Sequence, residues 1–221
     1  MFGNFFYRFL RYIVQFYFNS KYKITIYNKE KLPGKGSPAV GGKNTTGGYI
    51  IACNHQKYSD PPAISAVVKG RFSFMAKKEL FERSWYFTLL IKMCGAFPVD
   101  RGASDNSAIE RSISDIKKGR IFVIFPEGTR SKDGTIGKAK SGVALIAATA
   151  NVPVLPVCIM YGLNGNKRNL DFAVGDIIPA EEVSVPDLES GGRRELKRVS
   201  GRIMDSIKEL QQQILQERAK L

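Results

Sequence analysis

The chain has 221 residues, of which 34 are Lys or Arg and 20 are Asp or Glu, so its formal net charge is +14. The 43% hydrophobic content is ordinary for a globular protein, and the length suits a sizeable core. A single histidine excludes multi-histidine metal sites and histidine-to-histidine proton relays, while the excess positive charge fits a membrane surface, a phosphorylated substrate or nucleic acid.

The first predicted element is an amphipathic helix in residues 1–18, which contain nine aromatic residues. Arg8 and Arg11 interrupt the apolar run, so it makes a poor transmembrane span, which needs about 20 apolar residues. Aromatic rings with arginines are typical of a helix that lies in the membrane interface. Packing on the main domain is the alternative, and one helix can do both. The stripe at helical spacing consists of Phe2, Phe5, Phe6, Phe9, Ile13, Phe16 and Tyr17.

The next elements are short and end in a polar segment. Residues 22–27 alternate as a strand does, and the glycine-rich residues 34–48 predict a surface loop. Residues 49–53 form an apolar run that predicts a buried strand, and residues 59–63 predict an N-cap followed by proline in the first helical turn. The only histidine, His55, therefore follows a strand, and Asp60 begins a helix.

His55 and Asp60 form the first candidate site. Imidazole is the only side chain whose unperturbed pKa lies near neutral pH, which makes His55 the default acid–base group, and a carboxylate can orient such a ring. In a regular helix, positions five apart diverge by roughly 140°, so the two side chains meet only if the chain turns between them. The alternative is that Asp60 is only the helix N-cap and that His55 is a surface loop residue.

The rest of the chain alternates between helical and extended patterns. Helices are predicted over residues 61–69, 78–93, 104–118, 139–150 and 192–221, and strands over residues 120–125, 152–157 and 171–178. This order predicts an α/β fold. We expect three segments: an amphipathic helix at 1–20, an α/β domain at 21–190 and a charged C-terminal helix at 191–221. Residues 132–138, which contain Gly134 and Gly137, are a candidate lid.

Two more strand ends carry polar residues. The strand at 120–125 leads directly into Pro126-Glu127-Gly128-Thr129-Arg130-Ser131, in which Gly128 allows close backbone approach and Arg130 offers a fork suited to phosphate. Residues 95–102 contain a second apolar run, which ends at Arg101. Polar loops at strand ends are where α/β proteins bind ligands.

Together and in this order, these segments resemble the glycerolipid acyltransferase family. His55 and Asp60 match its first motif, Phe97–Arg101 its second and Phe125–Arg130 its third. Residues 152–157 are similar to the fourth motif, and residues 74–80 are similar to the segment between the first two. The resemblance covers about residues 49 to 161, and it implies a single domain with a mixed central β-sheet flanked by helices.

The resemblance also implies a reaction. His55 would remove the proton from the sn-2 hydroxyl of a lysophosphatidic acid, which would attack an acyl thioester to give phosphatidic acid, and Asp60 would orient His55. The phosphate would be bound by Arg101 and Arg130, with Lys77 as a third cation. Glu127, Gly128 and Thr129 would shape the glycerol-binding site, with backbone N–H groups available there. No cofactor or metal is expected; the acyl donor would be acyl-coenzyme A or acyl carrier protein.

The expected partners are the lysophospholipid, the thioester donor and anionic lipids, with the protein on the cytoplasmic face of the cell membrane. Alternatives are another hydroxyl acceptor (glycerol-3-phosphate or a lyso-aminolipid) and a non-catalytic lipid-binding protein. Cys53, two residues before His55, also leaves a thiol enzyme open. Three isolated cysteines fit a reducing compartment. A nucleic-acid partner rests on charge alone, because no recognisable binding module is present, so none is expected.

Overall fold

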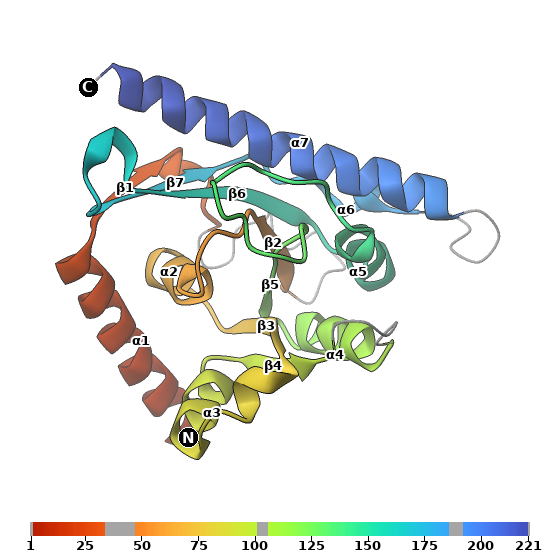
Figure 1. The fold of residues 1–221 in the computed structure, drawn as a ribbon. Helices are drawn as coiled ribbons and strands as arrows, with labels where there is room; N and C mark the ends of the chain where they lie inside the picture. Colours follow the sequence, from red (N-terminus) through yellow and green to blue (C-terminus); the bar gives the residue numbers. More distant parts are fainter. Residues whose placement is uncertain (1, 34–46, 101–105, 186–191, 221) are drawn as a thin grey trace.

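The computed structural model describes residues 2–33, 47–100, 106–185 and 192–220 (Figure 1). Its strands form a seven-stranded sheet in the order β1-β7-β6-β2-β5-β3-β4, in which only β6 and β7 pair antiparallel. The α/β class with a mixed central sheet is therefore confirmed. The strands are β1 (Lys23–Tyr27), β2 (Tyr49–Cys53), β3 (Phe72–Lys77), β4 (Ala96–Val99), β5 (Ile121–Ile124), β6 (Val154–Tyr161) and β7 (Asn169–Val174).

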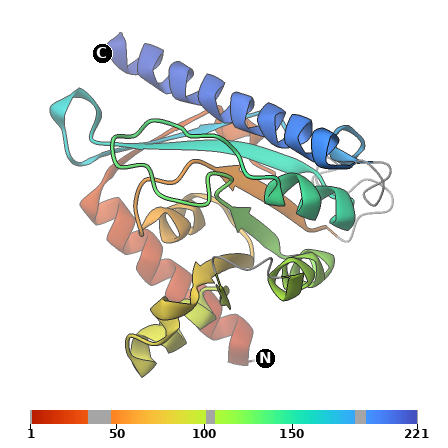
Figure 2. The ribbon, with the colours of Figure 1, turned by 45° about the vertical axis from the view of Figure 1, so that its right-hand side comes forward.

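Helices cover both faces of the sheet. One hydrophobic cluster joins the sheet to α1 and α2, and a second joins its other face to α4, α5 and α7 (Figures 1 and 2). The helices are α1 (Phe2–Lys21), α2 (Asp60–Val67), α3 (Trp85–Met93), α4 (Asn106–Lys117), α5 (Gly142–Ala150), α6 (Ala180–Val183) and α7 (Gly192–Ala219), with 3₁₀ turns η1 (Lys29–Lys31), η2 (Lys78–Phe81) and η3 (Leu163–Gly165).

Strand β2 lies in the middle of the sheet, between β5 and β6. Its side chains alternate between the two clusters, with Ile50 and Ala52 in one and Ile51 and Cys53 in the other. All five residues of β2 are buried because both faces of the sheet are covered, which explains the uninterrupted apolar run in the sequence. The chain leaves β2 at the centre of the molecule, and His55 follows directly.

The N-terminal helix α1 is present as predicted, and one of its faces packs on the domain. The Tyr7 hydroxyl donates to the Gly70 carbonyl at 3.0 Å, the Gln15 amide donates to the Ala66 carbonyl at 2.9 Å, and Phe18 is buried. Phe9 and Phe16, which belong to the predicted stripe, lie on the other face and are 53% and 77% exposed. Among the described helices, none has the length and apolarity needed to cross a membrane.

Some element boundaries differ from those predicted. Residues 78–93 form two pieces, because Ser84 is extended between η2 and α3 and the Thr88 hydroxyl caps the Phe81 carbonyl at 2.7 Å. Strand β7 begins at Asn169 rather than at residue 171, because this end pairs with both neighbouring strands. Most of the predicted loop at 34–48 lies outside the described residues.

Candidate active site

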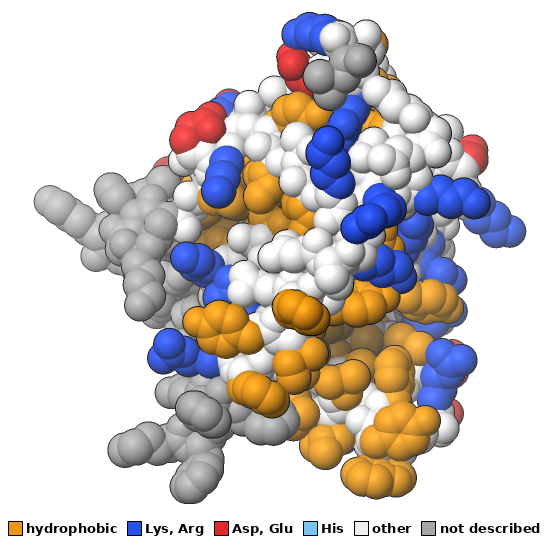
Figure 3. All heavy atoms as spheres, turned by 90° about the vertical axis from the view of Figure 1, so that its left-hand side faces the viewer, with side chains coloured by type: hydrophobic (Ala, Val, Ile, Leu, Met, Phe, Trp, Pro, Cys, Tyr) orange, Lys and Arg blue, Asp and Glu red, His pale blue; other side chains and the backbone are white. Residues whose placement is uncertain are grey.

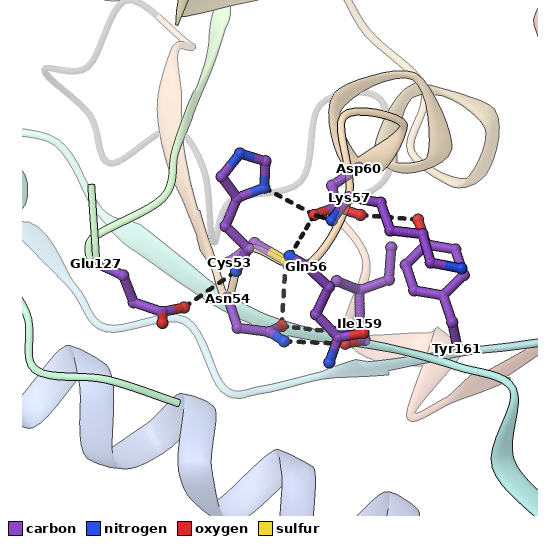
Figure 4. Close-up of polar contacts among 9 residues, drawn as sticks. Cys53, Asn54, Gln56, Lys57, Asp60, Glu127, Ile159 and Tyr161 are labelled. Atoms are coloured by element: carbon purple, nitrogen blue, oxygen red, sulfur yellow. Dashed lines mark hydrogen bonds and ion pairs between the residues drawn. The ribbon is translucent and has the colours of Figure 1, made fainter. Parts of the chain in front are cut away.

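The turn between β2 and α2 brings His55 and Asp60 together. Nδ1 of His55 lies 2.7 Å from Oδ2 of Asp60. The same carboxylate oxygen accepts hydrogen bonds from the backbone N–H groups of Gln56 at 2.7 Å and Lys57 at 2.8 Å, so Asp60 itself folds the turn (Figure 4). Asp60 begins α2, as predicted, but it is fully buried and its carboxylate faces back toward the histidine.

The second oxygen of Asp60 is held by a residue that sequence reasoning missed. The hydroxyl of Tyr161, at the end of β6, donates to Oδ1 at 2.8 Å (Figure 4). Burial, together with the nearby Asp60 charge, raises the pKa of Tyr161, so the phenol stays protonated and keeps donating. Lys57 lies over the Tyr161 ring, with Nζ 4.0 Å from its centroid. No local signal in the sequence pointed to Tyr161, because the strand predicted over residues 152–157 ends four residues before it.

Asn54 fixes the point at which the chain leaves the sheet. Its side-chain amide donates to the Ile159 carbonyl at 2.9 Å and accepts from the Ile159 N–H at 2.8 Å. The side chain thereby replaces the peptide group that β2 would have offered to β6 one step further along. The backbone of β2 is thus free to turn at His55 without leaving the β6 groups unpaired.

The ring of His55 is mostly buried but remains partly accessible to solvent. It stacks on Phe125 with centroids 4.1 Å apart and an interplanar angle of 20°. Its side chain retains 11% of its accessible surface. With Nδ1 directed at Asp60, the other ring nitrogen, Nε2, is the one that can serve a substrate.

The third motif packs against the first through Glu127. Oε1 of this buried carboxylate accepts the His55 backbone N–H at 3.0 Å (Figure 4), and Oε2 accepts the Gly137 N–H at 3.1 Å. The Ser131 N–H donates to the His55 carbonyl at 2.8 Å. The residues 132–138 suggested as a lid are anchored through Gly137 here, and the Gln211 amide of α7 donates to the Gly134 carbonyl at 2.9 Å.

Gly128 stands at a tight turn with φ of +73°, and its N–H donates to the Phe125 carbonyl at 2.9 Å. This N–H closes the turn, so the Gly128 N–H is already engaged among the backbone N–H groups that the resemblance implies are available at the glycerol site. The side chain of Lys140, a cation that the sequence analysis did not single out, crosses so close that a Cβ on Gly128 would lie 3.1 Å from its Nζ. Thr129 follows and is exposed.

The predicted phosphate-binding cations are spread over several elements. Arg130 is exposed and its guanidinium lies 3.6 Å from the centroid of the Tyr58 ring. The third motif therefore contacts the segment between His55 and Asp60 of the first motif. Lys77 is exposed at the end of β3. Arg101 lies outside the described residues. The structure thus places Arg130 beside the His55 turn and Lys77 at the end of another strand.

The alternative thiol mechanism finds no support at Cys53. Its side chain is fully buried in the cluster beneath α1 and α2, and this burial raises the pKa of the thiol well above its usual range. Across the described residues, no group of three or more His, Cys, Asp or Glu side chains is placed to hold a metal ion.

Comparison with known proteins gives the class to which this fold and site belong. The sequence model of the Acyltransferase family matches residues 23–160, and the chain belongs to this family. A 1-acyl-sn-glycerol-3-phosphate acyltransferase of Bacillus subtilis (strain 168) is 30% identical over 196 residues, which cover 86% of this chain and 89% of the relative. The enzyme of that name from Streptococcus pneumoniae is 31% identical over 197 residues, which cover 86% and 67%.

A solved structure supports the fold. The crystal structure of the 1-acyl-sn-glycerophosphate (LPA) acyltransferase PlsC from Thermotoga maritima superposes with a TM-score of 0.64. The similarity covers 94% of this chain and 81% of that one, at 22% sequence identity.

Proposed function

We propose that this chain transfers a fatty acyl group from an acyl thioester to the sn-2 hydroxyl of 1-acyl-sn-glycerol-3-phosphate, giving phosphatidic acid. The relatives from Bacillus subtilis and Streptococcus pneumoniae carry the name of this activity. The observation that carries the proposal is the 2.7 Å contact between His55 Nδ1 and Asp60 Oδ2. A protein that only binds lipid has no need of a base oriented in this way.

In the proposed reaction His55 is the general base. With Nδ1–H directed at Asp60, Nε2 accepts the proton of the acceptor hydroxyl while the hydroxyl oxygen attacks the thioester carbonyl. The ester C–O bond forms, the C–S bond breaks, and the imidazolium returns its proton to the leaving thiolate. Asp60 stabilises the imidazolium that forms between these two steps, and the enzyme ends in its starting protonation state.

Arg130 is the principal phosphate-binding residue in this proposal. Its guanidinium is exposed above Tyr58, and a planar fork of N–H donors matches phosphate oxygens. Arg101 and Lys77 complete the set of cations. Glu127, Gly128 and Thr129 shape the glycerol site, Glu127 indirectly, because both its oxygens accept hydrogen bonds from backbone N–H groups.

The acyl donor and the membrane location are proposed from the net charge of the chain and from the exposed face of α1. Coenzyme A thioesters and acyl carrier protein are both acidic, and a chain of net charge +14 suits either. We propose that the exposed stripe of α1, with Phe9, Ile13, Phe16 and Tyr17, holds the protein on the cytoplasmic face of the cell membrane.

Thiol release from an acyl thioester tests this proposal, measured in detergent with and without lysophosphatidic acid. We expect acceptor-dependent release that falls about 10²–10⁴-fold in His55→Ala, because the general base is lost. Thermal unfolding should show that the variant still folds. Wild-type turnover in His55→Ala would refute the mechanism. Release that depends only on a different acceptor would refute lysophosphatidic acid as the substrate.

The phosphate-binding role of Arg130 is tested in the same assay. Arg130→Ala should raise the KM for the acceptor, because a charge-assisted contact with the phosphate is lost. Arg194→Ala, which removes an exposed arginine from α7, is the matched control. Equal KM values for the two variants would show that Arg130 does not bind the headgroup.

A further inference from the structure

A second helix, α3, exposes an apolar face. Trp85, Tyr86, Leu89 and Leu90 are 80%, 66%, 50% and 41% exposed. Because positions four apart are neighbours on a helix, these side chains share one face, and no residue of α3 is buried. Single exposed apolar residues are ordinary on a protein surface, whereas a cluster of four on a helix of nine residues indicates a contact surface.

Helix α3 lies next to α1. Phe72 bridges them: its N–H donates to the Tyr7 hydroxyl of α1 at 3.3 Å, and its carbonyl lies 2.1 Å from where a Cβ on Gly95 would be. Gly95 comes two residues after the end of α3. Figures 1 and 2 both show α3 beside the N-terminal end of α1. The exposed apolar side chains of α3 therefore belong to a helix that lies beside the N-terminal end of α1, although the two helices are far apart in sequence.

The surface that contains both helices has a distinct charge pattern. In Figure 3, hydrophobic side chains gather over the lower half of this face around a hollow, and lysine and arginine side chains lie on both sides of them. Exposed basic residues on α1, on α3 and in the connection before α3 outnumber the acidic ones. They are Arg8, Lys21, Lys78, Arg83 and Lys92, against Glu79 and Glu82.

We propose that α3 is a second membrane-contacting helix and that α1 and α3 together form the face that rests on an anionic bilayer. Tryptophan and tyrosine favour the headgroup region, and flanking basic side chains are attracted to anionic lipids. The inference rests on the membrane contact proposed for α1 and extends it. Trp85 comes eight residues after Lys77, so contact at α3 would also hold a proposed headgroup-binding residue near the lipid surface.

The chain carries its own reporter for this contact, because Trp85 is its only tryptophan. We expect its fluorescence emission to move to shorter wavelength when vesicles containing phosphatidylglycerol are added to the unmodified protein. Phospholipids brominated on the acyl chains should quench it. Vesicles of phosphatidylcholine alone should give a smaller change at equal lipid. Unchanged emission in protein that co-sediments with the anionic vesicles would overturn the inference, and so would absence of binding to them.

A matched pair of variants tests whether α3 contributes to affinity. Leu90 on α3 and Leu215 on α7 are 41% and 39% exposed, so Leu90→Glu and Leu215→Glu introduce the same change at equally accessible positions. We expect vesicle binding to weaken roughly tenfold or more in Leu90→Glu. The variant lacks the leucine side chain whose transfer from water to the membrane would favour binding. Leu215→Glu should bind as wild type does. Equal binding by the two variants would overturn the contact.

The activity assay in detergent separates this inference from the proposed function. Acceptor-dependent thiol release with no lipid response at Trp85 would refute only the contact at α3. A lipid response at Trp85 without thiol release would refute only the proposed reaction. Thermal unfolding of Leu90→Glu, expected to match wild type because no α3 residue is buried, excludes misfolding as the cause of weak binding.

Discussion

Asp60 organises the site by engaging four groups with its two oxygens. Oδ2 meets the His55 ring and the N–H groups of Gln56 and Lys57, and Oδ1 accepts from Tyr161. A carboxylate constrained from both sides has little rotational freedom, so the histidine that it orients is fixed before any substrate binds. Such preorganisation lowers the cost of reaching the reactive geometry.

Tyr161→Phe tests this positioning, because it removes only the hydroxyl group that donates to Asp60. The variant leaves Oδ1 of Asp60 buried without its donor and lets the carboxylate rotate. We expect kcat to fall roughly tenfold, the equivalent of about one lost hydrogen bond, while the KM for the acceptor stays unchanged. Steady-state kinetics with varied acceptor gives both constants. An unchanged kcat would mean that the backbone contacts alone orient Asp60.

At this scale the contact between His55 and Asp60 could be predicted from the sequence, whereas the residues that hold this pair in place could not. His55 and Asp60 are five positions apart, and the proline-rich helix start beside them indicates a turn. Tyr161 lies 101 positions from Asp60, and nothing near either residue in the sequence shows that the ends of β2 and β6 meet. The sheet order decides this, and it depends on the packing of the whole chain.

At the scale of elements, Glu127 links the third motif, the β2–α2 turn and the segment at residues 132–138. Glu127→Gln should weaken this link, because the amide has one acceptor oxygen where the carboxylate offers two, and one backbone N–H would then face an NH₂ group. We expect the free energy of unfolding to fall by roughly 1–3 kcal/mol. Urea unfolding measures this change.

The same variant should be cleaved faster within residues 132–138 in limited proteolysis, because the Gly137 N–H is released from its acceptor. Gln211→Ala, which removes the other anchor of this segment at Gly134, should also accelerate cleavage. If neither variant changes the cleavage rate, these two contacts do not hold the segment.

Elements with strong local signals were predicted well. The apolar run of β2 and the proline-containing start of α2 appear where expected, but the Ser59 side chain makes no capping hydrogen bond. Residues 78–93 were predicted as one helix, yet Ser84 adopts an extended conformation between η2 and α3. Periodicity indicates which residues favour a helix, and specific contacts such as the hydrogen bond from the Thr88 hydroxyl to the Phe81 carbonyl decide where it begins.

For the molecule as a whole, the cysteines report on cooperative unfolding. Cys53 and Cys158 are fully buried while Cys94 is partly accessible, and burial raises the pKa of all three thiols. We expect a thiol reagent at pH 8 to modify only Cys94 in the folded protein. Cys53 and Cys158 should react at the rate of global unfolding. Rapid labelling of Cys53 without unfolding would reopen the thiol mechanism.

These thiols also predict how stability depends on pH. Their folded-state pKa values are raised above the unfolded value of about 8.5, so the folded state holds these protons more tightly. Their contribution to stability is fully present below that pH and is lost progressively as the pH rises above it. The urea midpoint should therefore fall at alkaline pH, and Cys158→Ala should reduce this dependence.

The β2–α2 turn is fixed at both ends by hydrogen bonds. At one end the Asn54 side chain bonds the N–H and the carbonyl of Ile159, and at the other end the Asp60 carboxylate contacts the His55 ring. Between these ends, Gln56 and Lys57 contribute to the turn through backbone N–H groups. The geometry of the turn therefore depends more on the number of residues between Asn54 and Asp60 than on the side chains of Gln56 and Lys57. During divergence of this chain, replacements other than proline are tolerable at Gln56, whereas an insertion or deletion of a single residue would carry the histidine out of register with its aspartate.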